Sequence, residues 1–476
     1  MPYNVRIVST FPPLRCGIGT FTRDMANALE HFTGEVGHIR VATIDDEDLS
    51  YHIPVDLVID KFNPDSWRDA THNITQRARE TNNPTVIILQ HEYGLDPADD
   101  GTPAGGRNYV KMAREFSEEG LLTFAYLHTV VLEPTTHQRS VVQGLAEHCD
   151  GLFVTTESAI DILDSDIYEV PRSKVKHVDH GIRMQNPSLH DRLHIKERYG
   201  IQDQFLATTL GMQSPRKGVE YGIRAFGRFL NESCTDTQRE HMLYFIGGEC
   251  HPNFRRAHDG RLYREYQQSI RDALREADVR WIRTNDLDEV DLADYEVVMY
   301  DRFLEEEALL DFYAATNAMI LPYLDMQQIS SGVLADTVGA GRVAIATKFL
   351  YAIELISPQY VEKEGLVMER NARGILVDPE EPSVEQIAQA LDLLVFNEDE
   401  RLGMERRAHE RGHQMRWQNS AWQLLQYIEF VRQKREISTG RGVRFERQGP
   451  SIYADRNEEL VAPPPRVPEE VPPRED

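Results

Sequence analysis

Two glycines near the N-terminus, Gly17 and Gly19, lie between an apolar run and a helical pattern. Glycines in this position let backbone N–H groups approach a phosphate, and the start of a helix adds a favourable dipole. The full G-x-G-x-x-G pattern of dinucleotide-binding proteins is absent, and a shorter glycine pair also occurs in ordinary turns. The segment therefore predicts either a phosphate-binding loop or a tight strand-to-helix turn.

A second segment, residues 211–218, again follows an apolar run and precedes a helical pattern. It begins with Gly211 and carries two adjacent cations, Arg216 and Lys217. An ammonium group offers a point charge and a guanidinium offers a planar fork, so the pair suits a diphosphate. The alternative is a solvated turn whose charges are incidental.

A third segment ends in Ser330, Ser331 and Gly332, directly before another helical pattern. Free N–H groups and hydroxyls at a helix start can bind an anion. The same residues also form ordinary helix caps, so this segment alone does not distinguish a site from a cap.

Three histidines, His91, His128 and His180, each follow an apolar run that predicts a strand. His91 is followed by Glu92, and a histidine beside a carboxylate indicates general-base chemistry or metal binding. An isolated histidine can equally be a hydrogen-bonded structural residue. The sequence contains neither the G-x-S-x-G pattern of hydrolases nor the G-x-x-x-x-G-K-[ST] pattern of P-loop nucleotidases.

Apolar runs that alternate with helical patterns position these segments, and they form two series. The predicted strands are residues 5–8, 39–43, 85–89, 122–127 and 151–155 in the first series, and 205–210, 242–247, 297–299, 318–321 and 343–346 in the second. Such alternation predicts parallel sheets covered on both faces. We therefore expect two doubly wound α/β domains with a ligand cleft between them, because ligands bind at the carboxyl ends of such strands.

We expect the first domain to cover residues 1–187 and the second 188–400. An amphipathic pattern at 417–434 predicts a return helix within residues 401–436. Residues 437–476 are expected to be a disordered tail, because 457–476 contain six prolines and eight charged residues.

The charge balance excludes some classes of protein. The net charge of −26 argues against a chain built to bind nucleic acid or an anionic membrane. No run approaches the roughly 18 apolar residues of a membrane span, and the N-terminus lacks a signal-peptide pattern, so we expect a cytoplasmic protein. The four scattered cysteines predict free thiols. Only 9 of the 52 basic residues are lysine, which indicates either a salt-rich cytosol or a GC-rich genome.

Together these segments resemble the retaining glycosyltransferases of family 4, which have the GT-B fold. The resemblance covers about residues 4–434. It rests on the order of several segments: Ser9–Pro13 with Cys16–Phe21, then His128, Asp150 and 180–182, then Gly211 with Lys217 and Gly218, then 303–315, 339–347 and the helix at 417–434.

The resemblance implies transfer of a sugar from a nucleotide-sugar, a UDP- or GDP-sugar, without a divalent metal. It implies that Lys217 and Arg216 stabilise the leaving diphosphate and that His128 lies near the anomeric carbon. Donor-binding positions would be Gly17, Gly19, Gly211, Phe303, Gln328, Ser330, Ser331, Gly332 and Asp336, and acceptor-side positions would be His91 and Glu92. Gln328 and Asp336 stand where the family has a pair of glutamates, and Met212 stands where it has an arginine that Arg216 could replace.

Two alternatives remain open at this stage. One is a glycoside phosphorylase of the same fold, with inorganic phosphate where the donor diphosphate would bind. The other is a catalytically weak protein that binds a sugar nucleotide, which the Gln328 and Asp336 departures favour. The expected partners are a nucleotide-sugar and a carbohydrate acceptor, with no integral membrane segment. The sequence does not indicate the oligomeric state.

Overall fold

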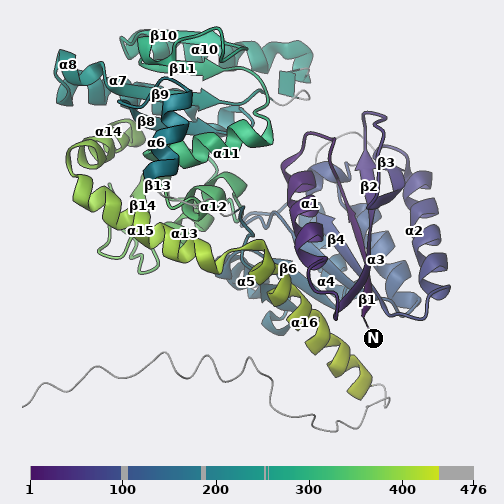
Figure 1. Cartoon of the computed structure of the whole chain (residues 1–476). Coiled ribbons are helices and arrows are strands. Elements are labelled where there is room, and N and C mark those ends of the chain that lie inside the picture. The colour runs from purple at the N-terminus through teal and green to yellow at the C-terminus, as the bar shows by residue number, and fades with distance from the viewer. Residues whose placement is uncertain (1, 98–104, 184–188, 251–253, 256, 439–476) are drawn as a thin grey trace, which may run out of the picture. The chain divides into compact units, whose positions relative to one another are not determined.

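Two parallel β-sheets organise the chain, as Figure 1 shows. The computed structural model describes residues 2–97, 105–183, 189–250, 254–255 and 257–438. Residues 1–429 form one compact unit, and the second unit begins at Phe430 within the last helix. The expected domain boundary at 187/188 falls on residues outside the described ones. So does the expected tail from residue 439 onward.

The first sheet has seven parallel strands in the order β3-β2-β1-β4-β5-β6-β7. Val5 in the central strand pairs with Ile39 on one side and Val86 on the other. The strands are β1 (Tyr3–Ser9), β2 (Val36–Asp45), β3 (Val55–Asp60), β4 (Thr85–His91), β5 (Leu122–Leu127), β6 (Gly151–Val154) and β7 (Val175–His177). The central strands are apolar and almost completely buried, because helices cover the sheet on both faces.

Helices α1 and α2 lie on opposite faces of this sheet (Figure 1). The helical elements here are α1 (Gly17–Leu29), α2 (Pro64–Arg79), η1 (Tyr93–Leu95), α3 (Arg107–Glu118), α4 (Thr136–His148), α5 (Glu157–Asp164) and η2 (Arg172–Lys174). Local sequence determines where several of them begin. Asn63 accepts a hydrogen bond from Asp65 N before α2, and Thr135 and Gln138 form a reciprocal capping box at α4.

The second sheet also has seven parallel strands, in the order β10-β11-β9-β8-β12-β13-β14. They are β8 (Phe205–Leu210), β9 (Met242–Gly247), β10 (Trp281–Thr284), β11 (Val297–Tyr300), β12 (Ala318–Leu321), β13 (Val343–Thr347) and β14 (Gly374–Val377). The helical elements around it are α6 (Leu189–Arg198), η3 (Pro215–Lys217), α7 (Val219–Ser233), α8 (Asp236–Arg239), η4 (Ala257–Gly260), α10 (Arg261–Glu276), η5 (Leu292–Asp294), α11 (Glu306–Ala315), α12 (Gly332–Gly339), α13 (Leu350–Ile356) and α14 (Glu381–Phe396).

The architecture of two doubly wound parallel sheets, expected from the sequence, is confirmed. The strand interpretation failed mainly at the sheet edges. It did not identify the edge strands β3 and β10, whose residues are largely half-exposed. It also missed β14, which is fully buried but only four residues long. None of the described helices is long and apolar enough to cross a membrane.

Two helices return from the second sheet to the first. The return helix expected at 417–434 corresponds to α16 (Trp417–Ser438), which follows α15 (Glu398–Gln414), a helix that packs on α12. Within α16 the ring of Tyr427 lies 5.6 Å from that of Phe153 and 6.2 Å from that of Phe124, both in the first sheet. Gly151 leaves room for this contact, because an added Cβ would lie 2.6 Å from the Tyr427 ring.

A contact between α12 and α15 leaves no room for a side chain. A Cβ on Gly412 would lie 2.9 Å from the Cα of Gly339, and a Cβ on Gly339 would lie 2.3 Å from the Ile182 side chain. Real Cβ atoms do not approach that closely, so the C-terminal end of α12 is held by backbone contact.

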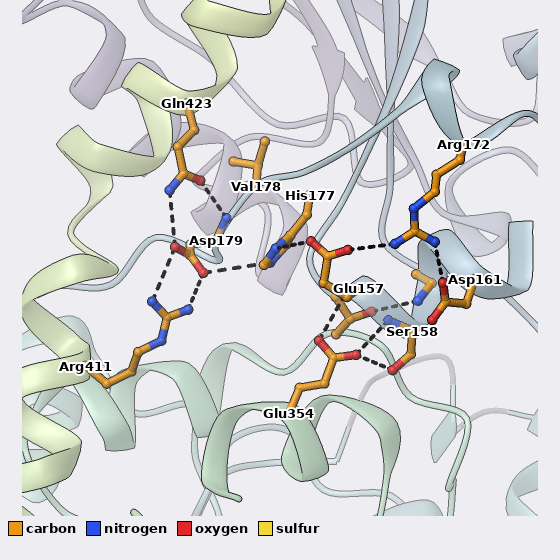
Figure 2. A network of polar contacts seen from close by, with 12 residues as sticks. Glu157, Ser158, Asp161, Arg172, His177, Val178, Asp179, Glu354, Arg411 and Gln423 are labelled. Atoms are coloured by element: carbon orange, nitrogen blue, oxygen red, sulfur yellow. Dashed lines mark hydrogen bonds and ion pairs between the residues drawn. The ribbon is translucent and has the colours of Figure 1, made fainter. Parts of the chain in front are cut away.

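A polar network ties the two sheet regions together (Figure 2). The Glu354 carboxylate, on α13, accepts hydrogen bonds from the backbone N–H groups of Glu157 and Ser158 at 2.9 and 2.7 Å. Thr156 accepts from Ala159 N, so the first three N–H groups of α5 are all bonded. A carboxylate at a helix N-terminus also interacts favourably with the helix dipole.

The second half of the network centres on Asp179, just after β7 (Figure 2). Its carboxylate accepts from Arg411 on α15 and from Gln423 Nε2 on α16 at 3.2 Å. The amide oxygen of Gln423 in turn accepts from Asp179 N at 3.0 Å. His177 lies 3.8 Å from Asp179 and 3.3 Å from Glu157, which links the two halves.

Replacing Glu354 by alanine removes the acceptor that serves two N–H groups of α5. We expect Glu354→Ala to lower the free energy of unfolding by about 1 to 2 kcal/mol, the usual loss for a helix cap. Urea denaturation measures this, with Glu362→Ala, at an exposed position, as the control. Equal stabilities of the two variants would show that the cap contributes nothing.

Candidate active site

A cleft of about 1560 Å³ opens where the two sheets present the carboxyl ends of their strands. Its walls come from loops after β1, β4, β5 and β7 in the first sheet and after β8, β9, β11 and β12 in the second. Strand order reverses between β1 and β4 and again between β8 and β12. These reversals are the switch points at which doubly wound sheets bind ligands.

Most of the predicted site residues line this cleft. Those in its wall are Gly17, Glu92, His128, Gly211, Arg216, Lys217, Phe303, Gln328, Ser330, Gly332 and Asp336, whereas Gly19, His91 and Ser331 lie behind it. His180, which follows β7, is also part of the wall.

The predicted glycine loop near the N-terminus is the first turn of α1, because the helix begins at Gly17. Cys16 precedes the helix and its side chain accepts no hydrogen bond from the helix N–H groups. The first N–H groups of a helix have no partner within the helix, and here the wall includes Cys16 and Gly17. Gly19 has a packing role, because an added Cβ would lie 3.3 Å from the backbone of Phe11.

The Arg216–Lys217 segment is fixed against the loop after β12. Gly218 has a φ of +59°, and a Cβ there would lie 2.0 Å from the carbonyl oxygen of Pro322. Leu324 N donates to the carbonyl oxygen of Arg216 at 2.9 Å. These contacts hold Lys217 Nζ 3.7 Å from the centre of the Tyr323 ring, a cation–π contact.

Carboxylates neutralise the arginines of the cleft. Arg216 lies 3.7 Å from Asp325, and Arg15 lies 3.4 Å from Glu249 with its guanidinium over the Phe303 ring. Among the described residues, no carboxylate forms an ion pair with Lys217. Lys217 therefore brings an unneutralised positive charge to the cleft.

Asp336 has an unexpected partner in the cleft. Arg183 donates to its carboxylate at 3.2 Å and to Glu306 at 3.1 Å. Arg23 also donates to Glu306, at 2.8 Å, and lies beside Asp24. Burial raises the pKa of Asp336 above its ordinary value. Sequence reasoning missed Arg183 because its partners lie more than 100 residues away in the chain.

The loop before α12 is anchored to the first sheet region at two points. Leu132 N donates to Gln327 Oε1 at 2.9 Å, and the Thr155 hydroxyl donates to the carbonyl oxygen of Ile329 at 2.6 Å. Gln328 Nε2 donates to the carbonyl oxygen of Ser330 at 2.6 Å. Ser331 caps α12 by accepting from Leu334 N, the ordinary cap that the sequence left open.

His128 and His180 present neutral rings to the cleft. Burial lowers the pKa of His128 to about 3 and that of His180 to about 4. His128 Nε2 lies 2.6 Å from Gln90 Oε1, and the amide oxygen of Gln90 can only accept, so Nε2 carries the proton. His180 Nδ1 donates to the carbonyl oxygen of Gly181, which leaves its Nε2 as an acceptor near Gly332. Each ring thus keeps one unprotonated nitrogen.

Glu92 and His91 are adjacent in sequence but differ in position. The Glu92 carboxylate accepts from the Thr129 hydroxyl and from Tyr93 N, and burial raises its pKa. His91 is completely buried against the rings of Tyr93 and Tyr109, and within the described part of the chain neither ring nitrogen has a hydrogen-bond partner. Only Glu92 lines the cleft.

One metal-like spacing lies elsewhere, on α15. His409-Glu410-Arg411-Gly412-His413 matches the H-E-x-x-H pattern of zinc peptidases. The Nε2 atoms of the two histidines lie 2.9 Å apart, but Arg416 places a guanidinium nitrogen 2.6 Å from His413 Nδ1. That donor fixes the proton of His413 on Nε2, the atom a metal would need. Within the described residues, no group of three or more side chains could hold a metal ion.

Comparisons with known proteins place the fold. No family model and no curated protein sequence matches the chain. Anabaena Alr3699/HepE, solved with UDP, is similar in structure with a TM-score of 0.63 at 14% identity, covering 90% of this chain and 100% of that one. The α,α-trehalose-phosphate synthase (UDP-forming) from Burkholderia xenovorans, solved with glucose-6-phosphate, gives 0.60 at 12%, covering 89% and 100%. A glycosyltransferase from Rickettsia africae gives 0.61 at 10%, covering 90% and 98%. The chain therefore has the GT-B fold.

Acid should destabilise the protein through His91. Burial lowers its pKa from 6.5 to about 4, so below pH 6.5 protons bind the unfolded chain more than the folded one. The protonation of His91 in the unfolded chain should lower the free energy of unfolding by about 1.4 kcal/mol for each pH unit between pH 6.5 and pH 4.

The comparison of wild type with His91→Phe isolates this contribution, because all other groups titrate alike in both. We expect the loss of unfolding free energy between pH 7.5 and 4.5 to be smaller in the variant. Parallel pH profiles from urea denaturation would show that His91 titrates normally.

Proposed function

We propose that this protein is a retaining glycosyltransferase, similar to family 4, that moves a sugar from a nucleotide-sugar to a hydroxyl acceptor. The observation that carries the proposal is Lys217, a cation without a carboxylate partner among the described residues, held over Tyr323 at the switch point of the second sheet. A diphosphate is the ligand whose charge would complete that arrangement.

The reaction breaks the bond between the anomeric carbon and the diphosphate oxygen. As the bond lengthens, negative charge gathers on the leaving diphosphate, and Lys217 and Arg216 stabilise it. The N–H groups in the first turn of α1, which the Cys16 side chain does not cap, add dipoles that favour the same charge. Stabilisation that grows as charge develops lowers the barrier more than it tightens substrate binding.

Retention requires the acceptor oxygen to arrive on the face from which the diphosphate departs. The acceptor hydroxyl forms the new bond to the anomeric carbon and gives its proton to an oxygen of the leaving phosphate. The products are the glycosylated acceptor and a nucleoside diphosphate. No side chain has to act as a covalent nucleophile in this scheme.

On the donor side, Gln328, Ser330 and Gly332 line the cleft where the loop reaches α12. Their polar atoms suit sugar hydroxyls and phosphate oxygens. Asp336 lies within α12 with Arg183 on its carboxylate, so the two act as one hydrogen-bonding unit towards the donor. Phe303 offers an apolar surface under the Arg15 guanidinium.

On the acceptor side, Glu92 and the unprotonated nitrogen of His128 are acceptors for sugar hydroxyls. Neither needs a proton transfer to do this, which agrees with the lowered pKa of His128. Glu92 also feels the positive charge of Arg216 across the cleft.

The similar structures favour a uridine nucleotide as the donor, and a GDP-sugar is the alternative. HepE was solved with UDP-glucose and with UDP and glucose, and an Escherichia coli trehalose-6-phosphate protein was solved with UDP-2-fluoro glucose. Fixed cations on the chain supply the charge that a divalent ion supplies in other transferases, so we propose a reaction independent of metal.

A panel of UDP-, GDP- and ADP-sugars tests the proposal. We expect release of one nucleoside diphosphate from one donor in the presence of simple sugar acceptors, unchanged by EDTA. A reaction that consumes inorganic phosphate stoichiometrically and needs no nucleotide-sugar would identify a phosphorylase. Saturable nucleotide binding without release from any donor would identify a binding protein.

Lys217→Ala should reduce kcat by about 100-fold or more, comparable with removal of a group that stabilises transition-state charge. Lys176→Ala, on the exposed face of β7, is the matched control and should keep full activity. Circular dichroism confirms that both variants fold. Near-normal turnover in Lys217→Ala would refute the role of this lysine.

A further inference from the structure

A cluster of buried cations lies in the second sheet region, outside the wall of the cleft. It consists of Arg192 and Lys196 on α6, Arg342 after α12, and Arg401 on α15. The arginine side chains are 5%, 1% and 9% exposed, and Lys196 is 4% exposed. Charges are rarely buried to this extent unless paired.

One buried carboxylate, Glu405, faces all three arginines. Its Oε1 lies 2.9 Å from Arg192 Nη2 and 3.0 Å from Arg401 Nη1, and its Oε2 lies 4.0 Å from Arg342 Nη1. Arg401 also reaches Glu398 at 2.9 Å, but that carboxylate is 71% exposed. One buried negative charge thus stands against four buried positive ones.

Neutral acceptors satisfy part of the cluster. Lys196 Nζ donates to the carbonyl oxygen of Gln204 and to Asn317 Oδ1, and Arg342 donates twice to the carbonyl oxygen of Ala314. The Nε–H groups of Arg192 and Arg401 are buried and have no hydrogen-bond partner among the residues that the structure describes. A buried donor without an acceptor is costly, and more so on a charged group.

The charges of the cluster also show an excess of positive over negative groups. Arginine stays protonated in proteins, so the cluster keeps a surplus of positive charge even when Lys196 is neutral. Burial and the neighbouring arginines lower the pKa of Lys196 to about 7, and burial lowers that of Arg342 to about 9. Uncompensated buried charge destabilises a fold strongly. The chain as a whole carries a net charge of −26, so this local excess of positive charge does not follow from the overall composition.

We propose that this cluster is a binding site for a small inorganic anion, held by Arg192, Arg342 and Arg401 beside Glu405. The anion accepts from the Nε–H groups of Arg192 and Arg401 and offsets the surplus charge. Chloride and hydrogen phosphate share this chemistry. The site is separate from the donor site, because it lies where α12 ends, whereas the start of α12 lines the cleft.

The test is thermal unfolding of the full chain at pH 7.5 and fixed ionic strength. The starting buffer contains gluconate, a larger anion than chloride or phosphate, which is then replaced stepwise by chloride in one arm and by phosphate in the other. Saturating UDP in every sample prevents phosphate from acting through the cleft. We expect a saturable rise in Tm in the arm that supplies the bound anion, because a ligand that binds only the folded state stabilises it.

Arg192→Met and Arg401→Met should abolish this saturable rise. Each variant also removes one surplus positive charge, so in gluconate buffer its Tm should equal or exceed that of the wild type. In the buffer that contains the anion that binds, its Tm should be lower than that of the wild type. Arg239→Met is the matched control, because Arg239 pairs with the buried Glu296 in the same sheet region and should leave the rise intact.

Crystals grown in bromide give a readout that does not depend on folding of the variants. An anomalous peak within hydrogen-bonding distance of Arg192 Nε or Arg401 Nε supports a halide site. The proposal is overturned if the wild type shows no saturable rise in Tm in either arm. It is also overturned if the Tm of every variant rises as much as that of the wild type. It is also overturned if both cluster variants are less stable than the wild type in every buffer, the result expected of a closed ion network.

Discussion

Opposite charges meet across the cleft, and the site depends on how they are distributed. Arginines on the side of the first sheet, Arg15, Arg23 and Arg183, pair with carboxylates from the second. These ion pairs hold the two walls in contact. Within each pair, the two charges neutralise each other. Among the described residues, no carboxylate forms an ion pair with Lys217. Its positive charge is therefore available to a ligand.

The position of Lys217 in turn depends on backbone geometry. Only a residue without a Cβ fits at position 218, where φ is positive and the carbonyl oxygen of Pro322 is close. The loop after β8 is thereby fixed to the loop after β12, and both lie at the switch point of the second sheet. A charged side chain on two mutually supporting loops is better oriented than one on a single free loop.

The fold was readable from the sequence because central parallel strands are continuous apolar runs. The edge strands β3 and β10 were not, since a half-exposed strand lacks that signal. Segments of the site were readable for a similar reason: Gly17, Lys217 and Ser330 each follow a strand that the pattern identified.

The partners of these residues were not readable from the sequence. Nothing near Asp336 in the chain indicates Arg183, and nothing near His91 indicates that it lies behind the wall while Glu92 reaches it. Such relations arise from packing between distant segments. The buried cations around Glu405 come from three separate places in the chain and escaped sequence analysis for the same reason.

The contact between Gly339 and Gly412 has a consequence for how this protein can change. Helix α12 has eight residues, so its start in the cleft and its end against α15 are separated by about 12 Å of rigid rod. A side chain added at Gly412 would push that rod along its length or tilt it, and the loop before α12 would move with it. The shape of the cleft can therefore change through a substitution outside it, and a map of tolerated substitutions would show α15 as sensitive as the cleft itself.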